Sequence, residues 1–79
     1  MYKIKFETID NVKSFVREIE RTESDSIIRT VNKKYAVDAK SLMGIFSLDL
    51  SNSLLLDIYG EENEFVDKIR ELGILIEEV

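Results

Sequence analysis

The first third of the chain combines a strand-like alternation with a helical apolar stripe. Residues 2–8 read YKIKFET, in which apolar and polar side chains alternate, and this period of two predicts a half-buried strand. Asp10 or Asn11 is expected to cap the helix that follows, because a short side-chain oxygen accepts hydrogen bonds from the free N–H groups of a first turn. Apolar positions at helical spacing then predict an amphipathic helix with an inward face of Val12, Phe15, Val16 and Ile19.

The middle of the chain predicts a hairpin, a short helix and a further strand. The β-rich runs 26–31 and 35–39 flank an Asn-Lys-Lys turn, which is typical of a β-hairpin. Ser41 is expected to open the second helix, and the apolar positions of that helix are Leu42, Ile45, Phe46 and Leu48. Residues 54–59 alternate again and predict the last strand, which Gly60 breaks.

A third helix is predicted to begin near Glu61. Its first turn is acidic and its later turns carry Lys68 and Arg70, an arrangement that suits the helix dipole. Its apolar stripe consists of Phe65, Val66, Ile69 and Leu72. Gly73 is a candidate C-terminal break, and residues 74–76 either pack as an extended tail or prolong the helix.

Three amphipathic helices among four strands need one shared apolar surface. A four-stranded sheet with all three helices on a single face provides it, so the sequence predicts an α+β two-layer sandwich. The length of 79 residues fits a single domain over residues 1–79 with one small core.

The amino-acid composition excludes several kinds of catalytic and metal-binding site. The chain has neither histidine nor cysteine, which excludes zinc sites built on those residues, a Ser-His-Asp triad and phosphohistidine. We therefore expect no enzyme activity, no metal and no cofactor. The net charge of -5 and the scattered basic residues argue against nucleic-acid binding. No apolar run is long enough to span a bilayer, so we expect a cytoplasmic protein that does not bind membranes.

Residues 40–48 read KSLMGIFSL. This segment resembles the Lys-Ser-Ile/Leu-Met-Gly-Val/Ile-x-Ser-Leu core of HPr, the phosphocarrier family of the sugar phosphotransferase system. The resemblance implies an antiparallel sheet with strand order 1-4-2-3. It places Ser41 where Gram-positive HPr proteins carry the serine that HPr kinase phosphorylates with ATP. It also places Leu42, Met43 and Phe46 on the exposed apolar patch that docks partners, with Lys40 beside them as a further candidate partner-binding residue.

The active-site motif of that family is missing here. In HPr a Gly-Ile-His-Ala-Arg-Pro-Ala motif follows the first strand, and its histidine accepts phosphate from enzyme I. Residues 8–14 read TIDNVKS in that place, so Ile9, Asp10 and Asn11 stand in a degenerate active-site loop. An acyl phosphate on Asp10 is an alternative to its capping role, although that chemistry normally uses a metal-loaded acidic cluster.

These observations favour a regulatory protein that cannot carry phosphate on histidine and that binds other proteins through its second helix, with phosphorylation of Ser41 as a switch. The implied partners are HPr kinase, a transcription regulator or components of the phosphotransferase system. Two simpler interpretations stay open. Serine is a preferred N-cap in any helix, and Leu42, Met43 and Phe46 can equally form part of the core or a homodimer interface in a domain that kept the fold and lost its link to sugar transport.

Overall fold

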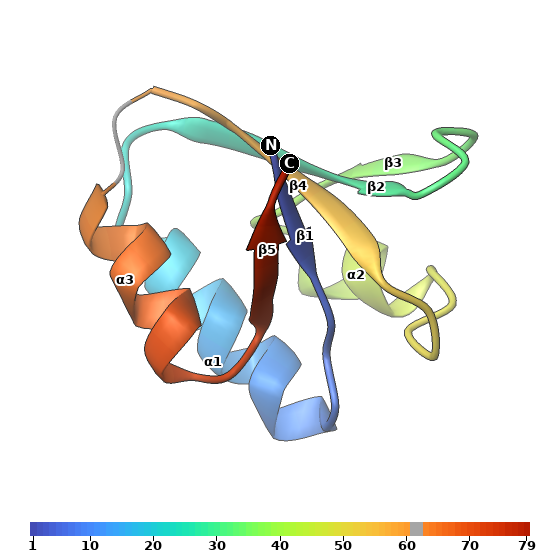
Figure 1. Cartoon of the computed structure of the whole chain (residues 1–79), viewed down its shortest axis with the longest axis horizontal. Coiled ribbons are helices and arrows are strands. Elements are labelled where there is room, and N and C mark those ends of the chain that lie inside the picture. The colour runs from blue at the N-terminus through green and yellow to red at the C-terminus, as the bar shows by residue number, and fades with distance from the viewer. Residues whose placement is uncertain (61–62) are drawn as a thin grey trace.

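The computed structural model describes residues 1–60 and 63–79, along which helices and strands alternate except at the β2–β3 hairpin (Figure 1). In chain order the elements are β1 (Tyr2–Ile4), α1 (Ile9–Ile19), β2 (Asp25–Thr30), β3 (Ala36–Asp38), α2 (Leu42–Phe46), β4 (Leu54–Tyr59), α3 (Asn63–Glu71) and β5 (Leu75–Glu78). The α+β class is thus confirmed. The start predicted for the third helix, near Glu61, lies outside the described residues.

The strands form one antiparallel sheet of five strands in the order β3-β2-β4-β1-β5. The prediction of a four-stranded sheet is therefore wrong, because the C-terminal segment adds a fifth strand outside β1, although β1 to β4 lie in the predicted order 1-4-2-3. The physical reason is the free edge of β1. Lys5 N–H donates to Ile74 C=O at 2.9 Å and Val79 N–H donates to Met1 C=O at 2.8 Å, so the segment after Gly73 is extended and does not prolong α3.

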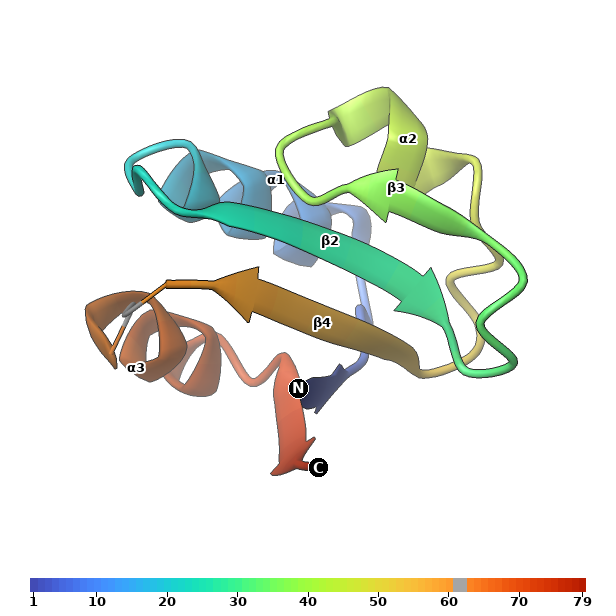
Figure 2. The same cartoon turned by 90° about the horizontal axis from the view of Figure 1, so that it is seen from above.

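All three helices lie on the same side of the sheet (Figures 1 and 2). The sheet contributes apolar side chains to the core from alternate positions, since successive strand residues point to opposite faces. The predicted stripe of α1 is fully buried, and Phe65 and Ile69 of α3 lie in the same cluster. The core members from the strands include Ile4, Ile28, Leu54 and Leu56. Within residues 1–60 and 63–79, no helix covers the other face of the sheet.

Thr8, and not Asp10 or Asn11, caps α1. Its backbone is extended, and its Oγ1 accepts a hydrogen bond from Asn11 N–H at 3.0 Å. Asn11 Oδ1 in turn accepts from Glu7 N–H at 3.1 Å. The arrangement differs from a capping box in that the side chain at N3 accepts from the residue before the N-cap and not from the N-cap itself. The N-cap lies two or three residues before the positions that the sequence suggested. The strand predicted over residues 2–8 accordingly ends at Ile4.

The C-terminal end of α3 follows the Schellman pattern. Ile74 N–H donates to Ile69 C=O and Gly73 N–H donates to Arg70 C=O, both at 3.1 Å. Gly73 has φ of +75°, a left-handed conformation that glycine adopts without a Cβ penalty. Ile69 and Ile74 are both fully buried beside this turn. The predicted break at Gly73 is thus confirmed, and it redirects the chain from α3 into β5.

None of the helices in the part of the chain that the structure describes has the length and the apolar character needed to cross a membrane.

We expect Gly73→Ala to lower the free energy of unfolding by about 1 kcal/mol, because an L-residue with positive φ is strained. A Cβ at this position would meet no atom within 4 Å, so the loss would report the backbone conformation alone. Urea unfolding of the two proteins measures it. Gly73→Asn is the control and should lose less, since asparagine tolerates this conformation better. An alanine variant as stable as the wild type would contradict this account of the turn.

Candidate functional site

Ser41 is the N-cap of α2, as its sequence position predicts. Its backbone is extended, with φ of -95° and ψ of 103°, and its Oγ accepts a hydrogen bond from Gly44 N–H at 3.0 Å. The residue is half-buried. A helix begins with four N–H groups that have no partner within it, and this hydrogen bond satisfies one of them in a helix of only five residues. Ser41 therefore has a structural role that does not depend on phosphorylation.

Lys40 connects α2 to the turn after α1. Its Nζ donates to Thr22 C=O at 3.0 Å, and its backbone N–H donates to Asp38 Oδ1 at 2.9 Å. The side chain is half-buried. A charged donor bound to a carbonyl oxygen in such a place is among the stronger hydrogen bonds of a protein. The lysine of the motif thus has an internal partner in this chain.

Gly44 allows α2 to approach β3 closely. A Cβ built at this position would lie 2.9 Å from Ser41 Oγ and 3.2 Å from the Cβ of Val37. The first distance is shorter than real Cβ contacts, so a larger residue would displace the capping oxygen or push the helix from the strand. The glycine of the motif is therefore explained by packing.

The apolar residues of α2 divide between the core and the surface. Ile45 is fully buried, while Leu42 and Leu48 are partly buried and pack against the core. Met43 is 79% exposed and Phe46 is 38% exposed. Of the three residues expected on the exposed patch, Met43 and Phe46 are thus classed as exposed and Leu42 is only partly accessible. Met43 is the most exposed of the large apolar side chains in the described residues.

The degenerate loop forms the first turn of α1. Ile9 is 62% exposed and Asp10 is exposed in the first helical turn, where a carboxylate suits the helix dipole. Asn11 is occupied as a capping partner. In the described ranges 1–60 and 63–79, no three or more acidic side chains are arranged to hold a metal ion. The structure thus shows no such cluster around Asp10.

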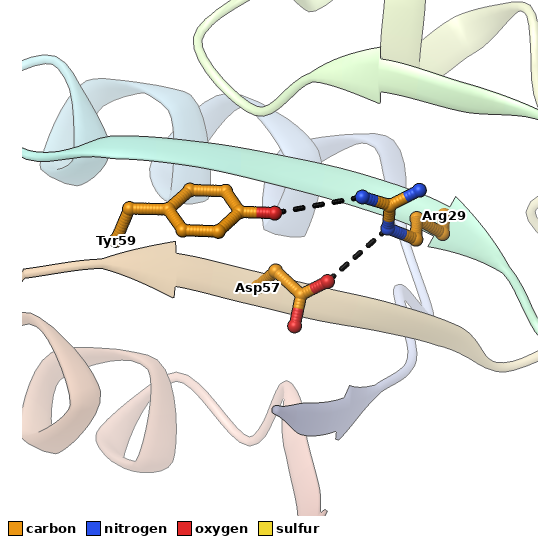
Figure 3. A network of polar contacts seen from close by, with 3 residues as sticks. All are labelled: Arg29, Asp57 and Tyr59. Carbon is orange, nitrogen blue, oxygen red and sulfur yellow. Dashed lines mark hydrogen bonds and ion pairs between the residues drawn. The ribbon is translucent and has the colours of Figure 1, made fainter.

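An ion pair on the uncovered face of the sheet was not predicted from the sequence. Arg29 Nε lies 3.1 Å from Asp57 Oδ2, and Arg29 Nη2 lies 3.5 Å from the hydroxyl of Tyr59 (Figure 3). The Tyr59 hydroxyl and the Asp57 carboxylate both raise the pKa of the Arg29 guanidinium. Asp57 and Tyr59 alternate along β4 and lie on the face opposite Leu56. This alternation is the signal in the sequence that could have indicated the contact. The group links β2 to β4 and is solvent-accessible.

The loop between α2 and β4 is organised by Asp49. Its carboxylate accepts hydrogen bonds from the Ser51 hydroxyl, the Ser51 N–H and Asn52 Nδ2, at 2.6, 3.0 and 3.1 Å. The bonds from Ser51, and to a lesser extent the nearby Lys5, hold the pKa of the Asp49 carboxyl below its usual value. A carboxylate with these local partners favours a tight turn.

Comparison with known proteins found no match for this chain among family models, curated proteins or solved structures. The resemblance to HPr therefore rests on residues 40–48 and on the order of the elements.

We expect Ser41→Ala to lower the free energy of unfolding by about 1 kcal/mol, because the variant loses the oxygen that accepts from Gly44 N–H. Chemical unfolding at neutral pH measures the difference. Ser41→Asp is the matched variant, since aspartate is an equally good N-cap, and it should restore most of the loss. Equal stability of all three proteins would show that the cap contributes little to this helix.

We expect the Asp49 carboxyl to titrate below its usual pKa and to shift upward in Ser51→Ala, which removes the hydroxyl donor. Because the folded-state pKa is lowered, the stabilisation by this group is complete above the unfolded-state pKa of about 4 and is lost as the pH falls through the folded value. Carbon-13 NMR of the carboxyl group measures the titration. Ser53→Ala is the control and should leave it unchanged. Identical titration in the wild type and Ser51→Ala would contradict this assignment.

Proposed function

We propose that this protein is an HPr-like α+β sandwich that acts as a regulatory protein-binding module and carries no phosphate on histidine. In this proposal partners contact α2, and phosphorylation of Ser41 switches that contact. The absence of histidine from the sequence removes the carrier reaction, so recognition is the property of the family that this chain can retain.

The observation that carries the proposal is the exposure of Met43. Lys40, Ser41 and Gly44 each have a structural role in this chain. Their agreement with the family motif can be explained by that role, so it supports a shared function less strongly than agreement at surface residues would. Met43 has no such role and is 79% exposed on the same helix as Phe46. Methionine is flexible and polarisable, which suits a surface that binds other proteins.

The switch is supported by the position of Ser41. Its hydroxyl is half-buried at the start of α2 and two residues from Met43. A phosphate there would add about two negative charges and three acceptor oxygens, next to the N–H of Gly44. Asp38 lies close by, since its C=O accepts from Ser41 N–H at 3.0 Å, and its carboxylate opposes the added charge. The expected effect is a change of charge and of α2 packing beside Met43.

A second candidate is a domain that has kept the fold and assembles with itself through Met43 and Phe46. The same exposed apolar pair favours it, because such pairs commonly form contacts between copies. It differs from the first candidate in predicting a concentration-dependent dimer and no response to a kinase. Phosphotransfer through Asp10 is a weaker alternative, since no acidic cluster to bind a metal accompanies this residue in the described ranges.

The test is the intact mass of the protein after incubation with HPr kinase and ATP. We expect the wild type to gain one phosphate and Ser41→Ala to gain none. Ser47→Ala is the matched control, because Ser47 lies at the other end of α2, and it should be modified like the wild type. Authentic HPr in the same tube reports that the kinase is active. No phosphate on the wild type while authentic HPr is modified would reject the switch. Sedimentation of wild type and Met43→Ser would then test the assembly candidate.

A further inference from the structure

β5 forms the edge of the sheet opposite β3 and lies beside β1 (Figures 1 and 2). Val79 N–H donates to Met1 C=O at 2.8 Å, so Val79 bonds toward β1. Since the pairing direction alternates along an antiparallel strand, the N–H and C=O of Glu78 point away from β1. Neither group makes a hydrogen bond within the described residues. A free edge of this kind can accept an added strand, whose residue opposite Glu78 would bond to both groups.

The side chains along this edge are accessible. Ile76 is 50% exposed and Val79 is 67% exposed, and the two glutamates between them, Glu77 and Glu78, are exposed as well. Side chains directly opposite each other on neighbouring strands lie about 5 Å apart. The edge therefore offers an extended segment two adjacent carboxylates flanked by apolar contacts.

The net charge of the protein is concentrated in this part of the chain. Residues 1–60 carry nine basic and nine acidic side chains, whereas residues 61–79 carry two basic and seven acidic ones. The second range therefore accounts for the whole net charge of -5. A field of one sign attracts a partner of the opposite sign.

The two carboxylates of β5 have little compensation from the chain itself. Glu77 lies 3.9 Å from Lys3 on β1, a loose contact between accessible groups, and Glu78 forms no ion pair with any residue that the structure describes. Lys68 and Arg70 of α3 pair with acids of their own helix. A cationic side chain on an added strand would stand directly opposite Glu77 or Glu78, and opposite charges in that arrangement are favourable.

These charges decide between the possible occupants of the edge. Pairing of β5 with β5 of a second copy would bring Glu77 and Glu78 of both chains together, and like charges on neighbouring strands are destabilising. An acidic segment would meet the same repulsion. A basic segment is complementary to the edge.

We propose that the free edge of β5 binds an extended basic segment of a partner protein, which pairs with the backbone at Glu78 and places its cations beside Glu77 and Glu78. Main-chain hydrogen bonds supply affinity, and the glutamates select the charge. This proposal does not depend on the function proposed for α2.

The test is an NMR titration of the nitrogen-15-labelled protein with the capped peptide Thr-Val-Lys-Lys-Val-Thr. Its adjacent lysines point to opposite faces of a strand, as Glu77 and Glu78 do. We expect saturable shifts of the Glu78 amide and its neighbours in β5, and none at Met43. The peptide Thr-Val-Glu-Glu-Val-Thr is the charge control and should not bind.

Two further peptides separate strand pairing from simple attraction of charge. Each is the lysine peptide with a single N-methyl group, on one lysine or on the other, so both keep the full positive charge. The lysine opposite Glu78 needs its N–H for the hydrogen bond, while the N–H of its neighbour points away from β5. We expect one methylated peptide to lose binding and the other to keep it.

The double variant Glu77→Gln/Glu78→Gln should bind the lysine peptide about tenfold more weakly. Glu20→Gln/Glu23→Gln is the matched control. It changes the net charge equally at two exposed positions around the end of α1, and it should bind like the wild type.

Several outcomes would overturn the proposal. They are no shifts at millimolar peptide, equal binding of the glutamate peptide, equal binding of the two methylated peptides, unchanged binding by the β5 double variant, and shifts that map outside β5. Concentration-dependent shifts of Glu78 in the free protein would also overturn it, because they would assign the edge to self-association.

Discussion

Phe15 joins the two layers of this small fold. Its ring meets Phe6 edge-on at 5.3 Å and Phe65 at 5.4 Å, and these three residues come from α1, the segment after β1, and α3. Edge-to-face aromatic pairs contribute roughly 0.5–1.5 kcal/mol beyond the burial of their area. A chain of 79 residues buries a modest fraction of its surface. These two aromatic contacts help to fix the orientation of α1 and α3 on the sheet, and α2 packs beside them through Ile45.

Local patterns predicted the elements well and their partners poorly. β4 was predicted at its observed bounds, because an alternating run ended by a glycine is a strong signal, and the buried face of α1 followed from its spacing. The first cap was missed because Asp10 and Asn11 are as good capping residues as Thr8, and only the backbone decides among them. The segment of β5 was predicted only as one of two alternatives, an extended tail, because its strand character comes from pairing with β1, which is far away in the sequence. The Arg29–Asp57 pair was missed for the same reason.

The HPr-like motif has two kinds of residue in this structure. Lys40, Ser41 and Gly44 hold α2 in place through a carbonyl contact, a cap and a close approach to Val37. Met43 does none of this and stays exposed. A short sequence can therefore persist because it builds a particular helix, and agreement with a family motif then says more about geometry than about regulation. The surface side chains are the part of the motif that separates these two explanations.

The position of β1 between β4 and β5 also governs when the fold can be completed. Among the described residues β1 pairs with β4 and β5, which come from the later part of the chain, while the β2–β3 hairpin closes locally. At synthesis rates of about 5–20 residues per second, β1 emerges several seconds before either partner exists. During that time the apolar side chains of β1 have no neighbouring strand to pack beside. The pairing of β1 is therefore a long-range step, and its unpaired edges favour aggregation until β4 and β5 have been synthesised.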